Sequence, residues 1–208
     1  MIGGRNGPRT IILSMGVTGA AVALSMPPLR SLIEQSMVWH MLVQMPLLVL
    51  GGWLSARALS DLPRVRPRTT WNRYGLSAFF AVQSILAYWM LPVAIDRAVV
   101  LPAADLVKVV SLFAVGWLLR RAMERSPALI QLFFVGSTVS MMAWLGTYFA
   151  TVNLRLCNAY SLESQIAAGH GLIIVTLALA LLWLVGTVTS PLRPRGRRNG
   201  PRMLWLTK

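Results

Sequence analysis

The sequence is dominated by apolar runs that are about as long as a bilayer is thick. We read six of them, at roughly 10–27, 30–54, 74–95, 104–121, 127–151 and 164–189. A helix needs about 20 apolar residues to cross the hydrocarbon core, and only helices or closed barrels can span lipid. Barrel strands would read as alternating segments of about ten residues. The continuous runs therefore predict an all-α, polytopic transmembrane helical bundle with about six spans.

The composition agrees with this fold class. Charged residues make up only 12% of the 208 residues, and 56% are hydrophobic, whereas a soluble domain carries about 25% charge. We expect two units: a transmembrane bundle over 1–190 and a basic cytoplasmic tail over 191–208. The stretch "ALSMPP" (23–28) also fits a signal-peptidase site, but we expect the first span to be retained.

The net charge of +14 is distributed unevenly between alternate connections. The N-terminus, the 55–73 loop, the 120–126 turn and the tail hold 16 of the 20 basic residues and two acidic ones. The opposite connections are neutral. Because cytoplasmic loops accumulate Arg and Lys, this pattern predicts both termini in the cytoplasm, and no nucleic-acid partner is needed to explain it. On the other side, we expect Lys108 to snorkel to the surface and Asp96 with Arg97 to form a surface pair.

Polar and sulfur-containing side chains gather in the outer half of the second span. On a helical wheel, Glu34, Met37, His40, Met41 and Gln44 fall within about 120° of arc, which predicts that they face the bundle interior. His40 would lie on the order of 10–15 Å below the outer surface.

A second histidine lies at a similar predicted depth in the last span. His170 follows Glu163 by seven residues and is flanked by Ala168, Gly169 and Gly171, small residues that let another helix approach closely. Met90 and Cys157 fall near the same end.

Thioether and imidazole groups together form a soft ligand set that suits Cu(I). The candidate metal site consists of His40, Met41, Met37, His170 and Met90. Three other interpretations remain open: methionine as flexible packing, histidine as a hydrogen-bonding group between helices, and two histidines as the axial ligands of a haem. No nucleophile–base pair or phosphate-binding loop appears in the sequence, so we do not expect an enzyme.

Three stretches resemble landmarks of the CtaG-type cytochrome c oxidase assembly factors. They are "SMVWHMLVQMPLLVLGG" (36–52), "YWMLPVAIDRAV" (88–99) and "YSLESQIAAGHGLI" (160–173), and their order and spacing also agree. The resemblance implies a multi-pass protein of the bacterial inner (cytoplasmic) membrane that assists copper handling or assembly of a respiratory oxidase. Its partners would be the lipid bilayer and a larger membrane complex such as a haem–copper oxidase.

The chain differs from the family pattern at several positions. Ser36 and Met90 stand where the family has histidines, and Ser164 stands where it has an aspartate. These differences favour a second hypothesis, a non-catalytic structural accessory subunit of a membrane respiratory or photosynthetic complex. A transporter or channel is the remaining alternative, with little intramembrane charge in its favour.

Overall fold

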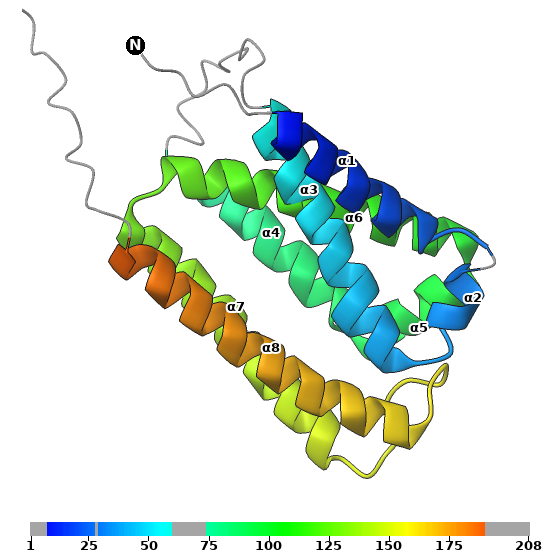
Figure 1. The fold of residues 1–208 in the computed structure, drawn as a ribbon. Helices are drawn as coiled ribbons and strands as arrows, with labels where there is room; N and C mark the ends of the chain where they lie inside the picture. Colours follow the sequence, from blue (N-terminus) through cyan, green and yellow to red (C-terminus); the bar gives the residue numbers. More distant parts are fainter. Residues whose placement is uncertain (1–7, 28, 60–73, 190–208) are drawn as a thin grey trace, which may run out of the picture.

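The computed structural model describes residues 8–27, 29–59 and 74–189, and within these ranges it contains helices and no strands (Figure 1). The predicted tail over 191–208 lies outside the described residues. The elements are α1 (Pro8–Ala23), α2 (Leu29–Ile33), the π-helix η1 (Trp39–Gln44), α3 (Met45–Ala58), α4 (Leu76–Trp89), α5 (Pro92–Val100), α6 (Pro102–Arg125), α7 (Ala128–Thr151) and α8 (Leu162–Thr189).

The described helices confirm the all-α fold, and four or five of them are long and apolar enough to span a membrane. Four single helices are long and apolar enough: the continuous segment Trp39–Ala58, α6, α7 and α8. A fifth span results if α4 and α5, which meet at a bend of 74°, are taken together. The apolar helix α1 has 16 residues, about 24 Å at 1.5 Å per residue, which is shorter than the other candidates.

Two predicted spans are interrupted where the sequence suggested continuous helices. The second predicted span is broken between α2 and the helical segment that begins at Met37. The third ends at Trp89, and Pro92 starts α5 in a new direction. Proline suits the first turn of a helix, because an amide hydrogen at that position would have no partner within the helix. Figure 1 shows both breaks at the same end of the bundle.

The helix ends sort into two groups. Figure 1 shows the start of α1, the end of α3, the start of α4, the end of α6, the start of α7 and the end of α8 at one end of the bundle. We call this the basic end, because Arg57, Arg120, Arg121 and Arg125 lie there. The opposite end holds α2, α5 and the connection from α7 to α8.

Close helix packing depends on small residues. A Cβ atom added at Gly52 would lie 1.9 Å from the Phe113 carbonyl oxygen, and one added at Gly116 would lie 1.9 Å from that of Val49. These two glycines therefore set the distance between α3 and α6. Gly169 approaches Ala150 on α7 in the same way, which confirms the expectation that small residues around His170 allow close approach.

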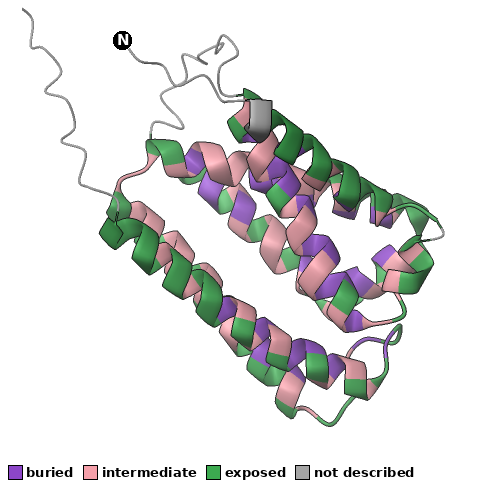
Figure 2. Ribbon diagram, in the orientation of Figure 1, coloured by how far each residue is buried: buried purple, intermediate pink, exposed green. Residues whose placement is uncertain are grey.

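Burial differs between the two ends of the α7–α8 hairpin (Figure 2). On α7 the buried residues Leu145, Gly146 and Phe149 lie in the second half of the helix. On α8 the buried residues run from Gln165 to Thr176, and none of the residues from Leu177 to Thr189 is buried. The hairpin is thus packed at the opposite end and less buried at the basic end.

We predict that Gly116→Ala lowers the free energy of unfolding by about 1–3 kcal/mol, because the added methyl group meets backbone and forces α3 and α6 apart. Thermal unfolding of the detergent-solubilised protein, followed by circular dichroism, measures the change. Gly136→Ala on α7 is the matched control, since a Cβ there meets nothing within 4 Å. Equal losses in both variants would contradict the packing described.

Candidate functional site

The interrupted second span places its polar face inside the protein. Met37, His40 and Gln44 are fully buried at 0%, and Met41 is exposed by only 7%. Residues 39–44 form the π-helix η1, a geometry that occurs mostly as short insertions and often at functional sites. The expectation that this face points inward is confirmed.

Contacts with α8 fix the start of this segment. The Met37 amide donates a hydrogen bond of 2.8 Å to Ser164 Oγ, and the hydroxyls of Ser36 and Ser164 lie 3.4 Å apart. At its other end, Gln44 Nε2 donates to the Leu24 carbonyl oxygen at 3.3 Å and to the hydroxyl of Ser25 at 3.2 Å. The buried face is therefore held between α8 and the end of α1.

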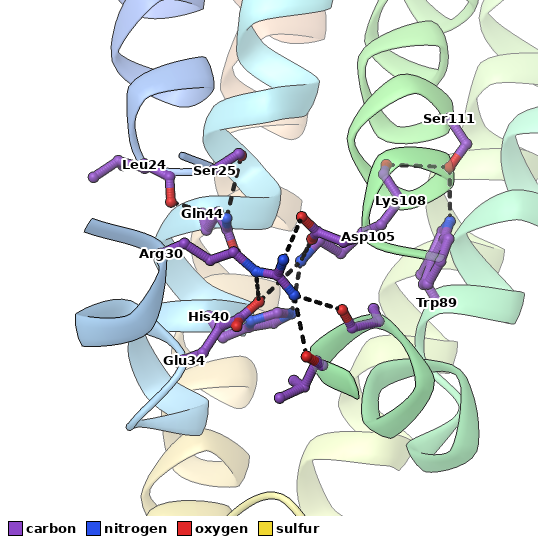
Figure 3. A network of polar contacts seen from close by, with 12 residues as sticks. Leu24, Ser25, Arg30, Glu34, His40, Gln44, Trp89, Asp105, Lys108 and Ser111 are labelled. Carbon is purple, nitrogen blue, oxygen red and sulfur yellow. Dashed lines mark hydrogen bonds and ion pairs between the residues drawn. The ribbon is translucent and has the colours of Figure 1, made fainter. Parts of the chain in front are cut away.

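A charged cluster lies directly against this face (Figure 3). Lys108 on α6 is fully buried, and its Nζ lies 2.7 Å from Asp105 Oδ1 and 3.8 Å from Glu34 Oε1. Arg30 contacts the same two carboxylates, with Nε 2.9 Å from Glu34 Oε1 and Nη1 3.4 Å from Asp105 Oδ2. Two cations and two anions thus balance each other, in an environment where an unpaired charge would be very unfavourable.

The expectation that Lys108 snorkels to the surface is wrong. The side chain turns inward because Asp105, three residues earlier on the same helix, and Glu34 supply the partners that water would otherwise supply. Residues three apart on a helix are neighbours, so the sequence could have predicted the pair of Asp105 and Lys108. The contact with Glu34 depends on the tertiary structure.

The charged cluster also joins separate elements. Arg30 Nη2 donates hydrogen bonds of 3.0 and 3.1 Å to the carbonyl oxygens of Ala98 and Val99, which lie in the last turn of α5. A cation is favourable at this position because helix C-termini carry unsatisfied carbonyl groups and a partial negative charge. The cluster therefore connects α2, α5 and α6.

His40 is in contact with the cluster through one ring nitrogen. Its Nε2 lies 3.5 Å from Lys108 Nζ. An ammonium group has donors only, so it can donate to Nε2 in the tautomer that carries the ring hydrogen on Nδ1. The Tyr160 ring lies 6.1 Å away at 58°. Among the described residues, His40 Nδ1 has no hydrogen-bond partner, nor do Gln44 Oε1 and the Tyr160 hydroxyl.

The candidate metal ligands are only partly brought together. Met37 and Met41 belong to the apolar core that adjoins His40, and Met90 packs against it. His170 is exposed on α8, on a face of the helix that the buried residues do not share. The structure thus places one imidazole, not two, in the buried region, and ligation of a haem by both histidines would require α8 to rotate about its axis.

Within the described ranges, no three His, Cys, Asp or Glu side chains converge in a way that could hold a metal ion. A soft metal at this position would therefore depend on thioethers with one imidazole. Cys157 is buried in the same core, but burial, together with the nearby Asp96 carboxylate, raises the pKa of its thiol to about 12. It remains a neutral thiol near pH 7, a weaker ligand than a thiolate.

The connection from α7 to α8 closes over the site. Gln165 Oε1 accepts a hydrogen bond of 2.8 Å from the Leu156 amide, and its Nε2 donates to the Leu154 carbonyl oxygen at 3.1 Å. Asp96 accepts hydrogen bonds from the amides of Asn158 and Ala159. Its carboxylate therefore holds this connection to α5, a role that the expected surface pair with Arg97 did not include.

Comparison with known proteins gives no match: no family model, no curated protein and no solved structure is similar to this chain.

We predict that removing the charge of Lys108 alone is strongly destabilising and that a compensating change rescues it. Lys108→Met should lower the free energy of unfolding by about 3–5 kcal/mol, because it leaves a buried carboxylate uncompensated. The Lys108→Met/Asp105→Asn double variant should lose clearly less than the two single variants together, because Arg30 and Glu34 still balance each other. Chemical unfolding in detergent provides the free energies, and additive losses would contradict a coupled cluster.

Proposed function

We propose that this protein is a non-enzymatic, CtaG-like membrane protein that assists copper handling for a respiratory oxidase. Cu(I) would be its cargo, held by His40, Met37 and Met41. The observation that carries the proposal is that these three side chains are buried on one short segment, beside the charged cluster at one end of the bundle. Thioether and imidazole ligands suit a soft cation such as Cu(I).

The resemblance rests on the positions that match the family pattern, and two of the positions that depart from it contact each other. Ser36 replaces a family histidine and Ser164 a family aspartate, and the two hydroxyls lie 3.4 Å apart in this structure. Asp96 and Gln165, which match the family pattern, both hold the connection over the site.

The charged cluster suggests how cargo could be accepted without exposing a bare charge. In the observed state, the Lys108 ammonium stands at the Nε2 lone pair of His40, which is where a metal cation would bind. A Cu(I) ion at that nitrogen would take the place of the ammonium's proton: Lys108 would release one proton to water as the ion enters, so that Asp105 and Glu34 still balance the buried charge. The reverse exchange would release the ion, so transfer is ligand exchange and requires no covalent chemistry.

We also propose the finer topology that this function requires. Six spans, counting α1 and the bent pair α4–α5, would place both termini in the cytoplasm of a bacterium and the site in the outer half of the inner membrane. The grouping of helix ends in Figure 1 supports this, because the sequence segments that adjoin the ends at the basic end hold 16 of the 20 basic residues and cytoplasmic regions are rich in Arg and Lys.

A structural accessory subunit is the second candidate function. The exposure of His170 favours this function, because the two histidines do not form one site. The charged cluster also favours it, because its members already neutralise each other without a metal ion. Such a subunit would co-purify in stoichiometric amount with a larger respiratory or photosynthetic complex and carry no metal of its own.

Cu(I) loading distinguishes the two functions. We expect the purified protein, loaded with Cu(I) under anaerobic conditions, to bind about one ion with sulfur and nitrogen neighbours in X-ray absorption spectra. His40→Ala should remove the nitrogen contribution and most of the bound copper.

His170→Ala is the matched control, because this histidine is exposed, and it should bind copper like the unchanged protein. Equal copper content in the His40→Ala variant would refute the copper proposal. Absence of copper, together with a stoichiometric complex in the native membrane extract, would establish the accessory subunit instead.

A further inference from the structure

A large apolar cavity lies in the half of the bundle near the basic end, away from the candidate copper site. Its volume is about 390 Å³, within the range of about 300–1,000 Å³ that is usual for ligand sites. Its lining includes Trp53 on α3, Phe79 and Gln83 on α4, Thr138 on α7, and Leu182 and Trp183 on α8.

The cavity follows from how the α7–α8 hairpin packs. The hairpin is buried only at the opposite end, where Gly146 and Gly169 bring the two helices together. Towards the basic end it leaves space against α3, α4 and α6. Leu182 lines this space and is nevertheless 68% exposed, so the cavity is open to the surroundings of the helices. In a membrane those surroundings are lipid.

The few polar groups of the lining indicate where a polar part of a ligand would lie. Thr138 Oγ1 donates a hydrogen bond of 2.8 Å to Gln83 Oε1, and Gln83 Nε2 donates to Met141 Sδ at 3.6 Å, so both side chains already have partners within the protein. The Trp183 indole nitrogen is buried without a hydrogen-bond partner among the described residues. It lies about 9 Å from the end of α8 at 1.5 Å per residue, where it could donate to an ester carbonyl.

Positive charge adjoins the cavity at the basic end. The Arg120 guanidinium lies 5.3 Å from the centre of the Trp53 ring, which lines the cavity. Its side chain is 29% exposed although it pairs with Glu124 at 3.0 Å, so a phosphate can reach it. Arg121 stacks on Trp117 in the same manner at 5.0 Å. Arginine recognises phosphate through paired hydrogen bonds.

We propose that this cavity binds an anionic phospholipid, with one acyl chain in the apolar space and the phosphate at Arg120. The occupant follows from three observations taken together: an apolar lining open to lipid, a buried indole donor and an arginine next to the lining. Anionic lipid is also the kind that basic membrane-proximal segments attract. The proposal does not depend on copper binding.

Native mass spectrometry of the delipidated full-length protein in detergent tests the proposal. Dioleoyl phosphatidylglycerol and dioleoyl phosphatidylcholine are added separately at matched concentrations. We expect tighter binding of phosphatidylglycerol. Val139 on α7 also lines the cavity; Val139→Trp, which fills it, should weaken this binding about tenfold, the factor that corresponds to about 1.4 kcal/mol. Arg120→Gln should reduce the affinity for phosphatidylglycerol to that for phosphatidylcholine.

Two controls accompany these variants. Leu129→Trp adds the same side chain on α7 at a position that is 76% exposed, and Arg97→Gln removes an exposed charge at the opposite end; neither should change lipid binding. If Val139→Trp does not fold, Val135→Phe fills the same cavity with a smaller change. Binding that survives filling of the cavity, equal binding of both lipids, or occupation of the cavity by another protein's helix would overturn the proposal.

Discussion

The burial of the Lys108 ammonium between two carboxylates is the interaction on which this structure depends. Removing an ammonium group from water costs several kcal/mol even after relaxation, and hydrocarbon offers no other partner. The cost is offset only if Asp105 and Glu34 stay in place. Glu34 is itself held by Arg30, and Arg30 is anchored on the carbonyl groups at the end of α5. One buried charge thus fixes the relative positions of α2, α5 and α6.

This arrangement divides the bundle into two unlike halves. At the opposite end, polar contacts and close glycine packing leave His40 fully buried and the neighbouring Met37 and Met41 at most 7% exposed. At the basic end the α7–α8 hairpin is more exposed and leaves a large apolar space. The enclosed half is suited to hold a small cation among soft donors, and the open half is suited to lipid. The two proposed roles therefore use different parts of the same chain.

The sequence predicted the features that depend on hydrophobicity and local spacing. Long apolar runs predicted the helices, and a helical wheel predicted the inward face from Met37 to Gln44. The wheel assumes 3.6 residues per turn, so it could not reveal the π-helical turn over Trp39–Gln44. The orientation of His170 was also not predicted, because small residues flank it on both sides and do not by themselves show which side packs against another helix. The inward turn of Lys108 depends on Glu34, 74 residues away in the sequence, and only the folded chain brings the two together.

The reactivity of Lys108 towards a water-soluble acylating reagent tests this account most directly, because Lys108 and Lys208 are the only lysines of the chain. The protein in lipid nanodiscs is treated with the reagent, and each lysine is quantified by peptide mass spectrometry against the same lysine in the denatured chain. A buried and paired ammonium predicts that Lys108 stays unmodified until the protein unfolds, while modification of Lys208 reports an active reagent. Modification of Lys108 in the folded protein at the rate of the denatured chain would contradict the account.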